Sequence, residues 1–175
     1  MIKMLIYIFI FVKNENRLNK FMKKLEDFVN EKLKVSVKHY KPKDLKELKQ
    51  MVKDAVADDN KADLNFIDTS LIISMNSLFE DIDFDGDISN WDVSKVKDMS
   101  YMFYTSNFTG KNSPGMDKWD VSNVEKMDSM FEQSKFEQDI SGWEIDPSCS
   151  VEAMFAHCPA ANNHKLIPQC LLRRI

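Results

Sequence analysis

Aspartates at alternating positions give this sequence its clearest candidate for metal chemistry. Asp81, Asp83 and Asp85 are followed by a glycine, and Asp92 stands eleven residues after the first of them. An EF-hand loop binds calcium through carboxylates at positions 1, 3 and 5, with glycine at 6 and usually glutamate at 12. Most of the same pattern recurs at 136–144, where the alternating aspartates are missing. The pattern therefore favours a solvated acidic turn, with a calcium site as the alternative.

Cysteine and histidine side chains are the other candidate ligands, and they gather near the C-terminal end. They are Cys149, His157, Cys158, His164 and Cys170. Their spacing fits no common zinc motif. Three cysteines, an odd number, also give no disulfide framework and do not indicate the redox compartment. We expect structural roles for these residues and no bound metal or cofactor.

Motifs of catalysis are missing from the rest of the chain. The sequence contains no G-x-S-x-G, no P-loop and no H-E-x-x-H. Residues 1–60 hold a single histidine, no cysteine and no clustered carboxylates, so they are a poor host for acid–base chemistry. We therefore expect a protein that is not an enzyme and that takes no small-molecule substrate.

A motif that occurs four times sets the positions of these side chains. Its clearest copy, at 84–103, reads FDGDISNWDVSKVKDMSYMF. The carboxylate that marks each copy recurs after 24, 28 and 24 residues, at Asp68, Asp92, Asp120 and Glu144. A fixed period in this range predicts a solenoid, in which each unit buries its apolar face only against its neighbours.

Alignment of the four copies places apolar residues in columns that we expect to form the core. The columns are Leu64, Ile88, Met116 and Ile140; Ile67, Trp91, Trp119 and Trp143; Met75, Met99, Met127 and Val151; Leu78, Met102, Met130 and Met154; and Phe79, Phe103, Phe131 and Phe155. The apolar step of about three within a copy fits neither a long helix nor an alternating strand. It predicts a tight coil with a short strand near 88–93 and one or two helical turns near 98–105.

The segment before the repeats has a different pattern. Residues 4–12 are apolar and too few to span a bilayer, and no A-x-A-like cleavage site follows them. A buried strand, a degenerate or uncleaved export signal and a misassigned start remain alternatives for this run. Apolar spacing then predicts an amphipathic helix over 15–33, a short strand over 34–40 and a second helix over 43–57 that caps the first repeat.

The run F-x-x-D-I-S-x-W-D-V-S-x-V-x-x-M-x-x-M-F resembles the repeats of BspA-like leucine-rich-repeat surface proteins of bacteria, over residues 64–158. Residues 40–48 also resemble the entry segment of such arrays. The resemblance implies an α/β fold: a leucine-rich-repeat-like solenoid of about four 24-residue units, each a short strand plus a short helix. Members of that family are commonly exported and some are adhesins, which implies a surface or secreted location. Without a clear signal peptide, a cytoplasmic location stays open.

Charge divides the chain into a basic and an acidic part. Residues 1–60 carry 14 basic and 9 acidic side chains, whereas residues 61–175 carry 10 and 19. An acidic repeat region repels phosphate, which argues against nucleic acid, and it favours a basic patch on a protein partner. We expect three regions: an N-terminal strand–helix–strand with a capping helix over 1–60, repeats over 61–160 and a tail over 161–175. Membrane association is not expected.

These features predict a non-catalytic protein-interaction module with a surface or adhesion role; the alternative is an intracellular binding protein or antagonist. The outward residues of the expected strand face form a polar, mostly acidic strip. We expect it to contact the partner through Asn90, Asp92, Asp117, Lys118, Asp120 and Glu144. The insertion at 110–115 is a candidate contact beside the strip. Alternatively, Asp92 and Asp120 only accept hydrogen bonds from backbone N–H groups in their own turns.

Overall fold

The computed structural model describes residues 40–174, which belong to one compact unit. The strand–helix–strand predicted before the repeats lies outside the described residues, apart from Tyr40. The helices of the described residues are α3 (Leu45–Asp58) and three short 3₁₀ helices, η1 (Met116–Lys118), η2 (Pro159–Asn162) and η3 (Gln169–Leu171). None of these helices is long and apolar enough to cross a bilayer.

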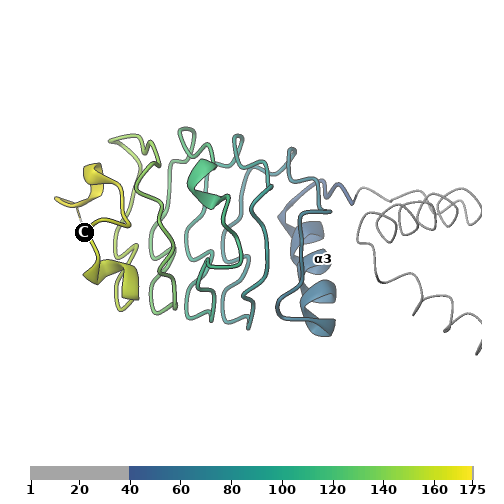
Figure 1. The fold of residues 1–175 in the computed structure, drawn as a ribbon. Coiled ribbons are helices and arrows are strands. Elements are labelled where there is room, and N and C mark those ends of the chain that lie inside the picture. Colours follow the sequence, from purple (N-terminus) through teal and green to yellow (C-terminus); the bar gives the residue numbers. More distant parts are fainter. Residues whose placement is uncertain (1–39, 175) are drawn as a thin grey trace, which may run out of the picture. The chain divides into compact units, whose positions relative to one another are not determined.

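Helix α3 is fixed at its start by two reciprocal hydrogen bonds. The carboxylate of Asp44 accepts from the backbone N–H of Glu47 at 2.9 Å, and the Glu47 carboxylate accepts from the N–H of Lys43 at 2.9 Å. Such a pair satisfies N–H groups that have no partner inside the helix. Leu48 and Val52, one turn apart, are fully buried in the core. The helix predicted over 43–57 is thus found at 45–58, and it lies beside the first repeat (Figure 1).

After α3 the chain runs through four successive segments that lie side by side (Figure 1). We call them coils 1 to 4 and define them as 60–83, 84–107, 108–135 and 136–158. Parallel bridges link equivalent residues of neighbouring coils. They pair Ser74 with Asp98, Asp98 with Lys126, and Lys126 with Ser150. The pairing therefore keeps the 24-, 28- and 24-residue steps of the sequence.

Alternate backbone N–H groups of each coil donate to carbonyl oxygens of the next, at 2.7–3.1 Å. The donors in coil 1 are Met75, Ser77, Phe79 and Asp81; in coil 2, Met99, Tyr101, Phe103 and Thr105; and in coil 3, Met127, Ser129, Phe131 and Gln133. The acceptors are also alternate residues, so one row of four hydrogen bonds recurs at each junction between coils. The coils are therefore joined by their backbones as well as by the core.

Two positions in each coil hold a non-glycine residue in the left-handed backbone region, with φ between 51° and 59°. They are Ser77, Tyr101, Ser129 and Ala153, and four residues later Asp81, Thr105, Gln133 and His157. A left-handed residue interrupts a right-handed helix. The helical turns predicted near 98–105 are consecutive turns instead, because alternate N–H groups there bond to the next coil. The strand predicted near 88–93 is likewise absent, since pairing in the described residues consists of isolated bridges.

Every residue of the five predicted core columns is buried. The phenylalanine column stacks ring on ring, with centroid distances of 5.2 Å from Phe79 to Phe103, 5.5 Å from Phe103 to Phe131 and 5.6 Å from Phe131 to Phe155. Burial of such large apolar side chains is the main stabilising contribution to the unit. The same core includes Leu48 of α3 and Leu171 near the C-terminus, so it continues across the boundaries predicted at 60 and 160.

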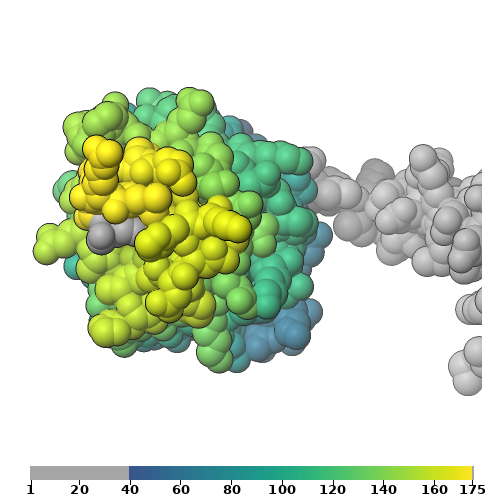
Figure 2. Space-filling model, turned by 60° about the vertical axis from the view of Figure 1, so that its left-hand side comes forward, coloured from purple at the N-terminus to yellow at the C-terminus, as the bar shows by residue number. Residues whose placement is uncertain are grey.

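The C-terminal segment, 159–174, closes one side of coil 4. The N–H of Ile140 donates to the carbonyl of Leu166 at 2.8 Å, and the N–H of Ala160 donates to the carbonyl of Phe136 at 3.1 Å. Ile167 and Leu171 are fully buried. Figure 2 shows these residues, in yellow, lying over the end of the stack.

Candidate functional site

The six side chains predicted to form a contact strip lie along one face of coils 2 to 4. A depression of about 350 Å³ is lined by Asn90, Asp92, Lys118 and Asp120 among others. The next depression, of about 330 Å³, is lined by Asp117, Lys118, Asp120 and Glu144 among others. Lys118 and Asp120 line both, so the two depressions adjoin. The structure thus brings all six predicted residues together.

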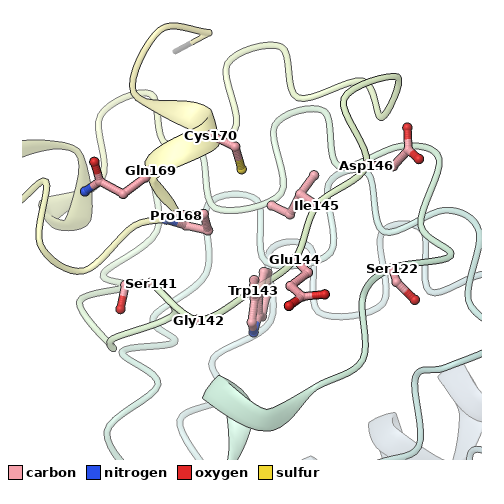
Figure 3. A pocket seen from close by; sticks show the side chains of 10 residues that line it. All are labelled: Ser122, Ser141, Gly142, Trp143, Glu144, Ile145, Asp146, Pro168, Gln169 and Cys170. Carbon is pink, nitrogen blue, oxygen red and sulfur yellow. The ribbon is translucent and has the colours of Figure 1, made fainter.

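A third depression, of about 480 Å³, continues the row toward the C-terminus (Figure 3). It shares Ser122, Gly142 and Glu144 with the second depression. Figure 3 shows coil 4 on one side and Pro168, Gln169 and Cys170 on the other. The sequence predicts only a tail over 161–175, so this wall was not expected. Ile167 and Leu171 are apolar and are both buried, so their presence in this segment is the signal that could have predicted packing there.

Two of the predicted residues are used within their own turns. The Asp92 carboxylate accepts from the N–H of Ser94 at 3.0 Å and from its hydroxyl at 2.6 Å. Asp120 accepts from the N–H and hydroxyl of Ser122 at 3.1 Å and 2.6 Å. The serine hydroxyl and then the N–H hold the pKa of each carboxyl below its usual range, because both bonds favour the charged form. These bonds agree with the alternative, structural interpretation of Asp92 and Asp120.

The other charged residues of the strip are available to a partner. Within residues 40–174, the side chains of Asp117, Lys118 and Glu144 make no hydrogen bond or ion pair, and all three residues are exposed. Asn90 uses its backbone N–H, which donates to the Asn65 side chain at 2.8 Å, and leaves its own amide group exposed. The strip thus presents two unbonded carboxylates and one ammonium group.

The floor of the strip is formed by three tryptophans, Trp91, Trp119 and Trp143, which are 3–5% exposed. The indole N–H of Trp91 donates to the carbonyl of Leu64 at 2.9 Å, and that of Trp143 donates to the carbonyl of Met116 at 2.7 Å. The buried indole N–H of Trp119 has no partner among the described residues. An unpaired buried donor is uncommon in folded proteins. It marks the junction between coils 2 and 3, where the insertion also lies.

The insertion at 110–115, a candidate contact beside the strip, is bonded to coil 2. The hydroxyl of Ser113, which is fully buried, donates to the carbonyl of Gly86 at 2.9 Å and accepts from the N–H of Ile88 at 3.1 Å. The side-chain amide of Asn112 donates to the carbonyl of Asp85 at 2.6 Å. These bonds give the insertion a structural role at the coil junction.

The aspartates of the EF-hand-like pattern bind side chains of the next coil. Asp81 accepts from the hydroxyl of Thr105, Asp83 from the amide of Asn107 at 3.0 Å, and Asp85 from the hydroxyl of Thr109 at 2.7 Å. The amides of Asn107 and then Asn60 hold the pKa of Asp83 below its usual range. Each of the three pairs spans 24 residues, one repeat. Their geometry is that of a polar ladder between coils.

The cysteine and histidine side chains of the described residues do not come together as a metal-binding group. Across residues 40–174 no group of three or more His, Cys, Asp or Glu side chains is arranged to hold a metal ion. Cys149 and Cys158 are buried free thiols. Burial raises the pKa of Cys149 to about 11 and also raises the pKa of Cys158. A thiol with a raised pKa is a weak nucleophile at neutral pH.

The described residues thus define a stack of coils with a polar, acidic face. Residues 46–167 match the family described as "Mycoplasma protein of unknown function, DUF285". Because the match covers more than half of the chain, the protein belongs to this family. Searches of curated proteins and of solved structures found no match.

Proposed function

We propose that the repeat region is a leucine-rich-repeat-like solenoid that acts as a non-catalytic protein-interaction module, with the acidic strip as its binding face. The observation that carries the proposal is the row of three adjoining depressions, which the six strip residues help to line. Asp117 and Glu144 are exposed carboxylates that no described side chain neutralises. An acidic face of this kind favours a basic patch on a protein partner.

Stacked coils support binding better than they support chemistry. The tryptophans beneath the strip are buried in the core, and Trp119 stacks on Trp143 with ring centroids 6.1 Å apart, so we expect a largely preformed surface. The described thiols are buried or lie singly, and the carboxylates Asp92 and Asp120 are held charged by their own turns. Rigid, preformed surfaces bind with little loss of conformational freedom. The BspA-like resemblance supports a surface or adhesion role, with an intracellular binding protein or antagonist as the alternative.

Charge reversal of the two unbonded carboxylates tests the proposal. The full chain carrying Asp117→Lys and Glu144→Lys is compared with the wild type as bait in a host or native extract. The control is Asp54→Lys with Asp58→Lys, which makes the same change of charge on exposed positions of α3. We expect the wild type and the control to retain the same partner proteins at low salt, and the strip variant to lose them. Rising salt should release these proteins from the wild type and the control, because it screens exposed charges. Equal retention by all three would exclude the strip.

Fractionation of the producing cells then separates the two locations. A protein found in the surface or secreted fraction supports the adhesion role. A soluble cytoplasmic pool with an intact Met1 supports the intracellular binding protein.

A further inference from the structure

The last coil carries a row of backbone donors that find no acceptor. In coils 1 to 3, four alternate N–H groups donate to the carbonyls of the following coil. The equivalent donors of coil 4 are the N–H groups of Val151, Ala153, Phe155 and His157. Within the part of the chain that the structure describes, none of these four N–H groups makes a hydrogen bond. The bonding pattern of the stack is therefore left open at this end.

A cavity of about 460 Å³ lies beside this row. Ala153 and Phe155 line it on the coil side, and Ala161, Leu172 and Arg174 line it on the side of the C-terminal segment. That segment bonds to coil 4 elsewhere, through the backbones of Phe136 and Ile140. The C-terminal segment thus covers part of this end of the stack, as Figure 2 shows, and leaves the donor row unbonded.

Backbone donors that lack partners favour a segment that brings acceptors. Buried N–H groups are almost always paired in folded proteins, and Phe155, whose N–H is unbonded, is 2% exposed. Protein segments that add to an open backbone edge gain affinity from main-chain hydrogen bonds and specificity from pockets for their side chains. Here the row of N–H groups offers main-chain hydrogen bonds, and the cavity offers a pocket for a side chain.

We propose that this end of the stack binds a segment of a partner protein, which lies along coil 4 as one further turn. The three existing junctions define its geometry: carbonyl oxygens of alternate residues must face the four donors at about 2.7–3.1 Å. The lining of the cavity is mainly apolar and includes Ala156, Ala161 and Leu172. Its polar members are Glu152, His164 and Arg174. The segment should therefore place an aliphatic side chain there, as Met130 and Met154 do within the stack.

A partner protein fits this row better than a second copy of the chain. A second copy would have to present the carbonyls of its own coil 1, and α3 lies at that end of the stack (Figure 1). The proposed site also shares no lining residue with the three depressions of the acidic strip. Its success or failure is therefore distinguishable from that of the proposed function.

Hydrogen exchange on the full chain tests whether the row is open. Ala153 and Ser129 occupy the same position in neighbouring coils, but only the N–H of Ser129 is bonded. His157 and Gln133 form a second matched pair. We expect the amides of Ala153 and His157 to exchange at least about ten-fold faster than their partners in coil 3. Equal protection within each pair would overturn the proposal.

Binding of a probe tests the occupant. The probe is a synthetic peptide of residues 97–106, KDMSYMFYTS, which supplies such carbonyls in the native stack. Titration of the ¹⁵N-labelled full chain should shift the amides of Val151, Ala153, Phe155 and His157 and slow the exchange of Ala153. A scrambled peptide of the same composition should leave them unchanged. Absence of binding at millimolar peptide, or shifts elsewhere only, would overturn the proposal.

A blocking variant supplies the matched comparison. Ala161→Trp fills the cavity from the C-terminal segment, whereas Ala57→Trp adds the same bulk at an exposed position of α3. We expect Ala161→Trp to weaken peptide binding at least about ten-fold and Ala57→Trp to leave it unchanged. The exchange and titration experiments on the wild type decide the proposal if Ala161→Trp does not fold. Protection of the same four amides by rising protein concentration alone would assign the row to a second copy and overturn the proposal.

Discussion

The indole N–H of Trp91 donates to the carbonyl of Leu64 across one coil junction, at 2.9 Å. The same bond is made by Trp143 with Met116, but the equivalent N–H of Trp119 is buried without a partner among the described residues. Three tryptophans of one column therefore share their burial and differ in their hydrogen bonding. This difference provides a comparison within a single protein.

Replacement of tryptophan by phenylalanine should be less harmful at position 119 than at 91. Both changes remove similar apolar area, but Trp91→Phe also removes a hydrogen bond to a buried carbonyl. We expect Trp91→Phe to lower the free energy of unfolding by about 1 kcal/mol more than Trp119→Phe. Urea denaturation of the two variants measures the difference. A larger loss in Trp119→Phe would show that its N–H has a partner.

The phenylalanine column predicts a large loss on truncation. Phe131 stacks between Phe103 and Phe155 and is fully buried. Phe131→Ala should destabilise the unit by about 3–5 kcal/mol through lost burial and the cavity left behind, and Trp119→Ala by a similar amount. Exposed Lys118→Ala should stay within about 0.5 kcal/mol of the wild type. Denaturant melts that show Phe131→Ala as stable as the wild type would remove the column from the core.

The serine-bonded aspartates predict a loss of stability in acid. The pKa values of Asp92, Asp120 and Asp146 are all lowered in the folded state, by the hydroxyl and then the N–H of the serine two residues on. A group whose folded pKa lies below its unfolded value, about 3.9 for aspartate, stabilises the fold above that value. This stabilisation is lost as the pH falls through the folded pKa. The melting temperature should therefore drop below about pH 4.

A pair of asparagine variants identifies the groups responsible for this acid dependence. Asp92→Asn removes one of the titrating carboxylates and should make the fall in melting temperature below about pH 4 shallower. Asp117→Asn is the control, because the Asp117 side chain bonds to nothing among the described residues. Identical acid slopes in the wild type and Asp92→Asn would assign the dependence to other carboxylates.

At a position with left-handed backbone, replacement of a residue by glycine should raise the free energy of unfolding. Ala153 has φ of 53°, which strains a residue that carries a Cβ. Ala153→Gly relieves this strain and should raise the free energy of unfolding by up to about 1 kcal/mol, even after the greater unfolded-state entropy of glycine. Ala57→Gly in α3 should lower it by up to about 1 kcal/mol. Thermal melts of the two variants should therefore move in opposite directions.

The core could be predicted from the sequence because each column keeps an apolar residue in all four copies of the motif. Trp91, Trp119 and Trp143 recur at the period of the motif, and all three are buried. Repetition reveals burial, since a column in a stack has the same neighbours in every coil. The backbone was less predictable. An apolar step of three suggested helical turns, whereas residues such as Tyr101 and Thr105 adopt left-handed conformations without glycine or asparagine to indicate it.

The candidate site was also predicted only in part from the sequence. The sequence predicted a common face for Asn90, Asp117 and Glu144, because each lies beside the tryptophan of its own copy, between core positions. For Asp81 and Asp83 it favoured a solvated acidic turn, with a calcium loop as the alternative. In the structure their carboxylates accept hydrogen bonds from Thr105 and Asn107 of the next coil. The signal for this ladder is present in the sequence as polar pairs one repeat apart. The wall at 168–170 depends on how residues 159–174 pack against coil 4. This packing could not be predicted from the motif, because these residues lie outside its four copies.

The donors and acceptors alternate in the same way at every junction of the stack, so a gene could gain or lose a whole coil. Each coil satisfies the donors of the coil before it and offers the same four donors in turn. Duplication of one 24-residue unit, such as coil 2, would therefore extend the protein without creating a new kind of junction. Only α3 and residues 159–174 have to stay where they are. Length in such a protein can vary between related genes by whole coils, while the two ends remain the same.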